Sequence, residues 1–321
     1  MDPLVSICCL TYNHEPYIKQ CIDGLLMQQT NFSFEVLIHD DASVDKTQAI
    51  IKEYKERYPD IIKPIFQIEN QYSKGVGVTR VYQFPRAKAK YIAMCEGDDY
   101  WTDPYKLQKQ IDFLESNPGY GMVHTDCDLY YQKEGKLIQN RNRTTNIPEG
   151  YIFNELLKNN FISTLTVVCE TGIIRKASEV VFSKQQKFMM GDYPLWLEIS
   201  KNTKIGYLSD STAVYRIHNK SVTHGGDIFN LTLATLETRL WFAERYNSDQ
   251  NNIAGLRNDI LKYRLKRSSF DLEKKIAEEC FRKLKTNKTL SRSDLFFYLG
   301  SKSRLLNAFL RIFLKLFKGI K

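Results

Sequence analysis

Residues 4–13 read Leu4-Val5-Ser6-Ile7-Cys8-Cys9-Leu10-Thr11-Tyr12-Asn13. The first seven are mostly apolar and the last three are polar, and a short apolar run bounded in this way is typical of a buried parallel strand. Asn13 is a residue type that caps helices, and Pro16 is tolerated in a first helical turn. The next apolar residues share one helical face, namely Ile18, Ile22, Leu25 and Leu26. The stretch therefore predicts a strand, a polar turn and a helix.

The same alternation of strand and helix continues to about residue 117. Further strands are predicted at 34–39, 61–68 and 91–95. One helix would begin at Asp45, with Gln48 completing a capping box, and another would begin at Asp103-Pro104. This alternation predicts an α/β fold, in which a Rossmann-like, mostly parallel sheet is covered by helices on both faces.

The pattern changes twice further along the chain. Short strands and loops are mixed between residues 120 and 225, and from about residue 228 the chain is helical and increasingly basic. We therefore predict a sheet-containing domain over 1–225 and a helical C-terminal region over 226–321.

Composition narrows the class of protein. With 43% hydrophobic and 12% aromatic residues the chain can fill a packed core, which excludes disorder over most of its length. The net charge of +9 suits nucleic acid, an anionic membrane surface or a phosphate-bearing substrate. Seven cysteines, none in a C-x-x-C pair, disfavour a zinc site or a disulfide framework. The N-terminus has no signal-peptide pattern and no run of about 18 apolar residues occurs, so a cytoplasmic protein is expected.

Polar clusters follow three of the predicted strands. They are Thr11-Tyr12-Asn13, Asp40-Asp41 and Asp98-Asp99. Because ligands of parallel α/β sheets bind outside the carboxyl ends of the strands, we expect the three clusters to line one site.

Carboxylates dominate two of these clusters. Asp98 and Asp99, with Glu96 nearby, are costly to bury at a strand end unless a cation or hydrogen-bond donors meet them. A hard divalent ion such as Mg²⁺ or Mn²⁺ takes such oxygen ligands together with substrate phosphates. A carboxylate of Asp40-Asp41 can accept from the imide N–H of uracil or from a ribose hydroxyl. Each pair taken alone also suits a solvated, helix-initiating turn.

Taken together, three segments resemble a known family. They are residues 5–13, residues 38–45 (Ile-His-Asp-Asp-Ala-Ser-Val-Asp) and Glu96-Gly97-Asp98-Asp99-Tyr100-Trp101. In this order and spacing, each at a strand end, they resemble family 2 glycosyltransferases, which have the GT-A fold. The resemblance covers residues 3–225. It implies an inverting transfer of a sugar from a nucleotide-sugar donor to an acceptor hydroxyl.

The resemblance also implies a donor site. Thr11 and Tyr12 match positions that contact the nucleotide base, and Asp41 matches the uracil-binding aspartate. Asp98 matches the acid that contacts the ribose or the metal, and Asp99 matches the acid that holds the metal against the donor diphosphate. Uridine diphosphate is therefore the expected carrier, with Mn²⁺ or Mg²⁺ as cofactor, while guanosine and deoxythymidine carriers stay open.

A catalytic base is expected further along the chain. Segment 190–197 resembles the family segment whose acid activates the acceptor, and Asp192 is the candidate, because the usual Glu-Asp is here Gly191-Asp192. The alternative for Asp192 is a helix cap. Many family members also have Asp where this chain has Glu96, whose longer side chain leaves its role open.

Partners for the diphosphate are expected among basic and amide residues. Segment 215–224 also resembles the family, and in it Arg216 can hold phosphate as a fork, while His218 can ligate the metal or touch the diphosphate. Between the second and third motifs, Arg86 is taken as a donor-binding candidate among the available Asn70, Lys74, Arg80 and Arg86. The other histidines are interpreted as structural or surface residues, namely His14, His39 and His124.

Residues 302–321 predict a basic amphipathic helix, with six Lys or Arg residues and no acid. One face would carry Arg304, Asn307, Arg311, Lys315 and Lys318. The opposite face would carry Leu306, Phe309, Leu310, Phe313, Phe317 and Ile320. Such a helix is expected to lie on an anionic bilayer, and the alternative is that it docks on its own domain by the same apolar face.

The function predicted from these features is sugar transfer in bacterial capsule or lipopolysaccharide synthesis, at the inner face of the cell membrane, with a glycan or lipid-linked acceptor. Nucleic acid is not an expected partner, because no stacking platform or groove-reading motif occurs. A nucleotidyltransferase is one alternative, but it would carry a glycine-rich basic loop where this chain has residues 11–15, Thr-Tyr-Asn-His-Glu. A non-catalytic carbohydrate- or membrane-binding protein is the other, and the acids at all matched positions disfavour it.

Overall fold

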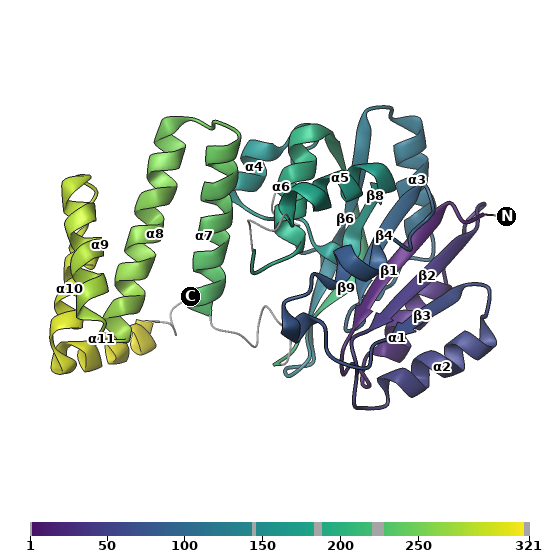
Figure 1. The fold of residues 1–321 in the computed structure, drawn as a ribbon, viewed down its shortest axis with the longest axis horizontal. Helices are drawn as coiled ribbons and strands as arrows, with labels where there is room; N and C mark the ends of the chain where they lie inside the picture. The colour runs from purple at the N-terminus through teal and green to yellow at the C-terminus, as the bar shows by residue number, and fades with distance from the viewer. Residues whose placement is uncertain (1, 143–145, 183–187, 220–227, 318–321) are drawn as a thin grey trace. The chain divides into compact units, whose positions relative to one another are not determined.

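The computed structural model describes residues 2–142, 146–182, 188–219 and 228–317. The chain forms two compact units, Met1–His224 and Gly225–Lys321 (Figure 1). The first contains a nine-stranded sheet, and the helices of the second run from α7 to α11.

One half of the sheet is parallel, in the order β3-β2-β1-β4. Its strands are β1 (Val5–Thr11), β2 (Phe34–Asp40), β3 (Ile62–Phe66) and β4 (Tyr91–Glu96). These confirm the four strands predicted from the sequence. The apolar residues of β1, β2 and β4 are buried on both sides of the sheet, which is why these strands read as continuous apolar runs rather than as alternating ones.

The other half of the sheet is mixed. Its strands are β5 (Tyr100–Trp101), β6 (Tyr120–Tyr131), β7 (Lys136–Ile138), β8 (Val167–Glu170) and β9 (Lys204–Ile217). Strand β8 runs antiparallel to both β4 and β6, whereas β6 and β9 are parallel and β5 is antiparallel to β9. The α/β class is confirmed, and the parallel arrangement that we predicted for the sheet holds for its N-terminal half and for the β6–β9 pair.

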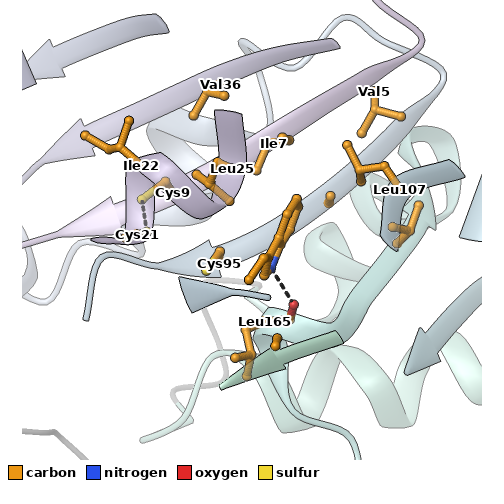
Figure 2. Packing of buried hydrophobic residues seen from close by; sticks show 14 of the residues in the cluster. Val5, Ile7, Cys9, Cys21, Ile22, Leu25, Val36, Cys95, Leu107 and Leu165 are labelled. Atoms are coloured by element: carbon orange, nitrogen blue, oxygen red, sulfur yellow. Dashed lines mark hydrogen bonds between the residues drawn. The ribbon is translucent and has the colours of Figure 1, made fainter. Parts of the chain in front are cut away.

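Three helices cover one face of the parallel half. They are α1 (Ile18–Leu26), α2 (Thr47–Arg57) and α3 (Lys106–Ser116). Alternate residues of β1, Val5, Ile7 and Cys9, are fully buried with residues of all three helices. Figure 2 shows side chains of β1 beside Ile22 and Leu25 of α1 in this core. Burial of each such aliphatic side chain is worth about 1.5–3 kcal/mol, so this face anchors the strand ends that carry the site.

The opposite face of the sheet is covered by the chain between β3 and β4. Its short helical turns are η1 (Tyr72–Lys74) and η2 (Thr79–Gln83). Gln83 is fully buried, and its Nε2 donates to Cys9 O and Leu37 O, both at 2.8 Å. The remaining elements of this unit are α4 (Phe153–Lys158), η3 (Thr164–Thr166), α5 (Thr171–Val181) and α6 (Asp192–Asn202).

Both predicted helices form, but two of their predicted capping contacts are wrong. Asn13 does not cap α1, because its backbone is left-handed (φ 54°) and its Oδ1 instead accepts Val44 N at 2.9 Å. Gln48 completes no capping box, because its Nε2 donates to Asp40 Oδ1 at 2.6 Å. Both side chains connect the loop after β1 or β2 to a neighbouring segment, so tertiary contacts override the local pattern.

The second unit is built only of helices among its described residues. They are α7 (Ile228–Arg245), α8 (Gln250–Phe270), α9 (Lys274–Thr286), α10 (Arg292–Lys302) and α11 (Arg304–Phe317). Its own small core joins Leu265 of α8 with Ala277, Cys280 and Leu284 of α9. No helix in the described part of the chain is long and apolar enough to cross a membrane.

The C-terminal helix forms as predicted, but one assignment of its faces is wrong. Asn307, placed on the polar outer face, is 4% exposed, and its Nδ2 donates to Ser269 O of α8. Leu310 is buried, as the docking alternative implies, whereas Phe309 of the same predicted apolar face is 70% exposed. The structure describes no side chain of this helix beyond Leu310, so the remaining predicted face positions lie outside the described side chains, namely Arg311, Phe313, Lys315, Phe317, Lys318 and Ile320.

All seven cysteines are free and buried. Cys9 Sγ lies 3.9 Å from Cys21 Sγ within the core beneath β1, as Figure 2 shows. Burial raises the pKa of the Cys8 thiol to about 12. The thiols therefore behave as small apolar core residues, as their apolar sequence context indicated.

Candidate active site

The three polar clusters meet at the carboxyl edge of the parallel strands, as predicted. Thr11 pairs in register with Asp40, and Leu10 pairs with Glu96. The backbone continues the pairing past the strands, because Asp41 N donates to Thr11 O at 3.0 Å and Gly97 N donates to Leu10 O at 2.8 Å.

The first cluster contributes one buried and one exposed side chain. Thr11 is 3% exposed, and its Oγ1 has no hydrogen-bond partner among the described residues. Tyr12 is 44% exposed. A buried hydroxyl without a partner beside an exposed tyrosine ring is suited to receive a polar ligand such as a nucleotide base.

In the second cluster, Asp40 and Asp41 each fix a loop through hydrogen bonds to backbone N–H groups. Asp40 is fully buried and accepts Ser43 N at 3.0 Å, which shapes the turn after β2. Asp41 accepts Gln71 N at 2.8 Å through one carboxylate oxygen and Tyr72 N at 3.0 Å through the other. Asp41 therefore fixes the start of η1, and its role in uracil binding stays a prediction.

Acidic side chains crowd the end of β4. Burial, followed by the charges of Asp98 and Asp192, raises the pKa of Glu96 to about 8. Burial, followed by Asp98 and Glu96, raises the pKa of Asp99 well above its usual value. The group therefore resists carrying its full negative charge, and a bound cation would relieve that cost.

Asp98 lies between two histidines. Its Oδ2 is 3.0 Å from His218 Nε2 and 3.9 Å from His14 Nε2. Burial opposes its ionisation, but the hydrogen bond with His218 and the charge of His14 outweigh burial and lower the pKa of Asp98. The structure thus brings the predicted residues Asp98 and His218 together and adds His14, which we had interpreted as structural or at the surface.

The donor atoms at this edge fit a hard divalent ion in their chemistry. Asp98 and Glu96 supply carboxylate oxygens, and Oε2 of Glu96 has no hydrogen-bond partner among the described residues. The described residues contain no ready-made group of three or more metal-ligating side chains. Mg²⁺-type sites commonly use one or two carboxylates and take their remaining ligands from substrate phosphates and water, so this donor set is compatible with such a site.

Asp99 is hydrogen-bonded to β9. It is 3% exposed, and its Oδ1 accepts Arg216 N at 2.7 Å. The Asp99 carboxylate therefore ties the end of β4 to β9, and its predicted role as a metal ligand stays a prediction.

The Arg216 guanidinium donates hydrogen bonds to three groups of the protein. Its Nε donates to Asp98 O at 2.8 Å, Nη1 to Gln132 Oε1 at 2.6 Å and Nη2 to Gln20 Oε1 at 2.7 Å. The guanidinium also lies 4.9–5.6 Å from three tyrosine ring centroids, those of Tyr17, Tyr100 and Tyr130. With the residue only 5% exposed, this geometry suits the positioning of Asp98 and does not offer the fork to a phosphate.

Asp192 lies close to the acidic side chains at the end of β4. It starts α6, and its Oδ2 accepts from Thr164 Oγ1 at 3.2 Å. The charge of Asp192 contributes to the raised pKa of Glu96, and Thr164 lines the same small cavity as Glu96. Thr164 thus connects the base candidate to the end of β4, and it is a site residue that the sequence analysis did not identify.

The structure does not bring Arg86 to the site, which corrects the prediction. Its Nη2 donates to Lys63 O at 2.8 Å, near the start of β3 and away from the carboxyl edge. Of the other candidates, Asn70 Nδ2 donates to Asp41 O at 3.2 Å, and Lys74 pairs with Glu69. Arg80 is exposed.

Comparison with known proteins identifies the family of the chain. The model of the family described as glycosyl transferase family 2 matches residues 6–182, more than half of the chain. The chain belongs to this family. Its β1, β2 and β4 strand ends all lie within the matched segment, as the sequence resemblance implied.

Curated relatives of this family 2 member come from several bacteria. An uncharacterized protein of Mycobacterium tuberculosis is 33% identical over 68% of the chain, which spans only 60% of that protein. The UDP-Glc:alpha-D-GlcNAc-diphosphoundecaprenol beta-1,3-glucosyltransferase WfaP of Escherichia coli is 30% identical, over 68% of this chain and 80% of its own. The putative teichuronic acid biosynthesis glycosyltransferase TuaG of Bacillus subtilis is 28% identical, over 69% and 82%.

Solved structures share the fold of the family 2 chain. S. aureus TarS 1-349 in complex with UDP-GlcNAc has a TM-score of 0.55 at 16% identity, over 92% of this chain and 79% of its own. The mannosyltransferase PcManGT from Pyrobaculum calidifontis, in complex with GDP-Man and Mn²⁺, has a TM-score of 0.53 at 14% identity, over 96% and 86%. The likeness confirms the GT-A type of fold predicted from the sequence.

Proposed function

We propose that this family 2 member is an inverting glycosyltransferase, which moves a sugar from a nucleotide-sugar to an acceptor hydroxyl in bacterial surface polysaccharide synthesis. The observation that carries the proposal is the placement of Asp98 and Asp192. Asp98 stands at the end of β4 beside His218, and Asp192 approaches the same carboxylate cluster through Thr164. One acid can serve the donor while the other serves the acceptor.

Asp192 is the proposed general base. A carboxylate within hydrogen-bond reach can accept the proton of the attacking hydroxyl as the new glycosidic bond forms. The Thr164 hydroxyl, which donates to Asp192 at 3.2 Å, holds the carboxylate in place. Attack from the face opposite the leaving diphosphate would invert the anomeric carbon.

Asp98 and His218 are the proposed holders of Mn²⁺ or Mg²⁺, with Asp99 as the further acid of the motif. When bound, such an ion stabilises the charge that grows on the leaving diphosphate. Arg216 positions the Asp98 backbone through the bond from its Nε to Asp98 O. Thr11, Tyr12 and Asp41 are the proposed contacts to the base of the nucleotide.

UDP is the proposed carrier of the donor sugar. The name of WfaP includes UDP-Glc, and TarS was solved with UDP-GlcNAc, whereas PcManGT was solved with GDP-Man. A lipid-linked acceptor is proposed because the acceptor in the name of WfaP carries a diphosphoundecaprenol group. Such an acceptor would place the enzyme at the inner face of the cell membrane, with its basic C-terminal helix against the bilayer.

Calorimetric titration tests the donor site. UDP, GDP and dTDP are titrated into the full chain with and without Mn²⁺, and UDP is expected to bind with Mn²⁺ present. Asp98→Asn should weaken this metal-dependent binding at least about tenfold, because it removes a charged ligand. The control is Asp112→Asn, on the outer side of α3.

The variant Asp192→Asn tests the role of Asp192 in sugar transfer separately from donor binding. We expect this variant to bind UDP and Mn²⁺ like the wild type but to lose turnover of UDP-glucose with a diphosphoundecaprenol-linked GlcNAc by about a hundredfold or more. Absence of nucleotide binding in the wild type would refute the proposed function, and unchanged turnover in Asp192→Asn would refute the role of the base.

A further inference from the structure

Helix α10 packs Phe297 and Tyr298 against the small helical core but leaves three other large apolar residues exposed. Asp294 is 4% exposed and Ser301 is fully buried, whereas Leu295, Phe296 and Leu299 are 42–44% exposed. These three positions share one helical face, because residues i, i+1 and i+4 lie side by side. The exposed face of a surface helix in a globular protein normally carries polar residues instead.

Specific contacts fix α10 in this orientation. Ser291 and Asp294 form a capping box at its start, which accounts for the buried acid. A Cβ at Gly300 would lie 2.2 Å from Leu310 Cδ1 and 2.9 Å from Ser269 Oγ, so α10 packs closely against these side chains of α11 and α8. These contacts hold α10 in a defined orientation, so the exposure of its apolar face does not result from loose packing.

The start of α11 repeats the same arrangement ten residues later. Leu305, Leu306 and Phe309 occupy positions i, i+1 and i+4 and are 77%, 39% and 70% exposed, while Asn307 is buried. Two consecutive helices thus each leave an apolar face uncovered. Side chains of this size are rarely exposed in groups without a binding role.

The charge around these helices is strongly positive. From Arg282 to Arg304 the chain has seven Lys or Arg residues, all exposed, and one acid, the buried Asp294. Residues 225–321 contain 20 Lys or Arg and 10 Asp or Glu, a net charge of +10, whereas residues 1–224 contain 26 and 27, a net charge of −1. The positive charge of the protein is therefore confined to the helical unit.

We infer that the exposed faces of α10 and α11 together form a docking surface for an anionic lipid bilayer, with Leu295, Phe296 and Leu299 of α10 as anchors in addition to the C-terminal helix. Apolar side chains would enter the boundary between headgroups and acyl chains while neighbouring Lys and Arg meet the anionic headgroups. The inference deepens the proposed membrane location of the enzyme.

The charge argues for a bilayer over other occupants. A second copy of the chain would bring a unit of +10 against another of +10, which like-charge repulsion disfavours. Nucleic acid would use the basic residues, but four of the six exposed apolar side chains on these helices are leucines, which offer no ring for base stacking.

Vesicle co-sedimentation of the full chain tests the surface. The vesicles consist of phosphatidylglycerol with phosphatidylcholine, or of phosphatidylcholine alone. The wild type should bind the anionic vesicles and bind less as salt is raised. The combined variant Leu295→Ser/Phe296→Ser/Leu299→Ser should lose about tenfold or more of its partitioning. The matched control is Ile276→Ser on α9, which removes a side chain 44% exposed in the same unit.

Two further measurements distinguish failure of the docking surface from failure of the proposed function. Circular dichroism and UDP titration should be unchanged in the triple variant, because α10 lies outside the sheet-containing unit. Vesicle binding without UDP binding would refute the proposed function but support this surface. Undiminished vesicle binding by the triple variant, or a dimer in the wild type that the variant converts to a monomer without losing vesicle binding, would overturn the inference.

Discussion

Gly97 occupies a very close approach at the end of β4. A Cβ at this position would lie 2.8 Å from Thr11 Oγ1 and 2.9 Å from His14 Nδ1. Thr11 ends β1 and His14 lies in the loop that follows, so the absence of a side chain at Gly97 lets the end of β1 and this loop approach the acidic motif. The glycine in the Glu96-Gly97-Asp98-Asp99 segment therefore has a steric reason.

Gly97→Ala is expected to displace Thr11 and His14 and to weaken UDP binding in the presence of Mn²⁺ about tenfold or more, because overpacking shifts its neighbours by tenths of an ångström. Calorimetric titration measures the effect. Gly172→Ala is the control, since its added Cβ meets nothing within 4 Å. Equal Kd values for the two variants would contradict the steric argument.

Lys106 is a charged residue type in the middle of the core. It is fully buried, its Nζ donates to Gln110 Oε1 and to Thr166 O at 3.3 Å, and it lies 4.7 Å from the Trp101 ring centroid. Burial lowers the pKa of Lys106 to about 7. Between pH 7 and about pH 10 the unfolded chain therefore binds more protons than the folded protein, and stability falls as the pH falls through this window.

Lys106→Met should remove this dependence. The slope of the unfolding free energy against pH between 7 and 9 is expected to decrease by about 1.4 kcal/mol per pH unit relative to the wild type. Urea denaturation at pH 7, 8 and 9 measures it. Lys109→Met on the same helix is the control, because its ion pairs with Asp103 and Asp210 raise rather than lower the pKa of Lys109. Parallel curves for wild type and Lys106→Met would refute the assignment.

At the scale of elements, β9 is the strand that completes the site. Its 14 residues end at Ile217 and carry Arg216, whose backbone N–H binds Asp99 and whose guanidinium binds Asp98 O. His218 follows directly and meets Asp98. One strand from late in the sequence thus holds both acids that follow β4.

Arg216→Lys should loosen this connection. A lysine keeps the charge but cannot reach Asp98 O, Gln132 and Gln20 at once, so we expect a loss of about 2 kcal/mol or more in unfolding free energy together with weaker UDP binding. Thermal denaturation and calorimetry measure the two effects. Arg57→Lys, an exposed change on α2, should leave both unchanged. A loss of UDP binding without any loss of stability would instead favour direct contact with phosphate.

The elements that the sequence predicted well are those whose signal is local. Strands β1 to β4 are short apolar runs between turns, and the acids after β2 and β4 follow from the parallel arrangement. The order of β8, β6 and β9 depends on pairing between distant segments, for which no local pattern exists. His14 and Thr164 were missed for the same reason, because only the folded loops bring them to Asp98 and Asp192.

At the scale of the whole molecule, the two units differ strongly in net charge. The overall net charge of +9 gives no hint that one unit is near neutral and the other carries +10. The helical unit was predicted from its composition, and so was its basic character. The exposed apolar face of α10 was not, because it depends on the contacts of Gly300 and on the capping of Asp294.

Because every cysteine is buried, alkylation of each thiol reports the unfolding of the region around it. Six of them lie in the first unit, and Cys280 alone lies in the second. A pulse of iodoacetamide along a urea gradient, read by mass spectrometry of peptides, should alkylate Cys280 at lower urea than the other six, because the helical core is the smaller one. Simultaneous alkylation of all seven would show that the two units open in one cooperative step.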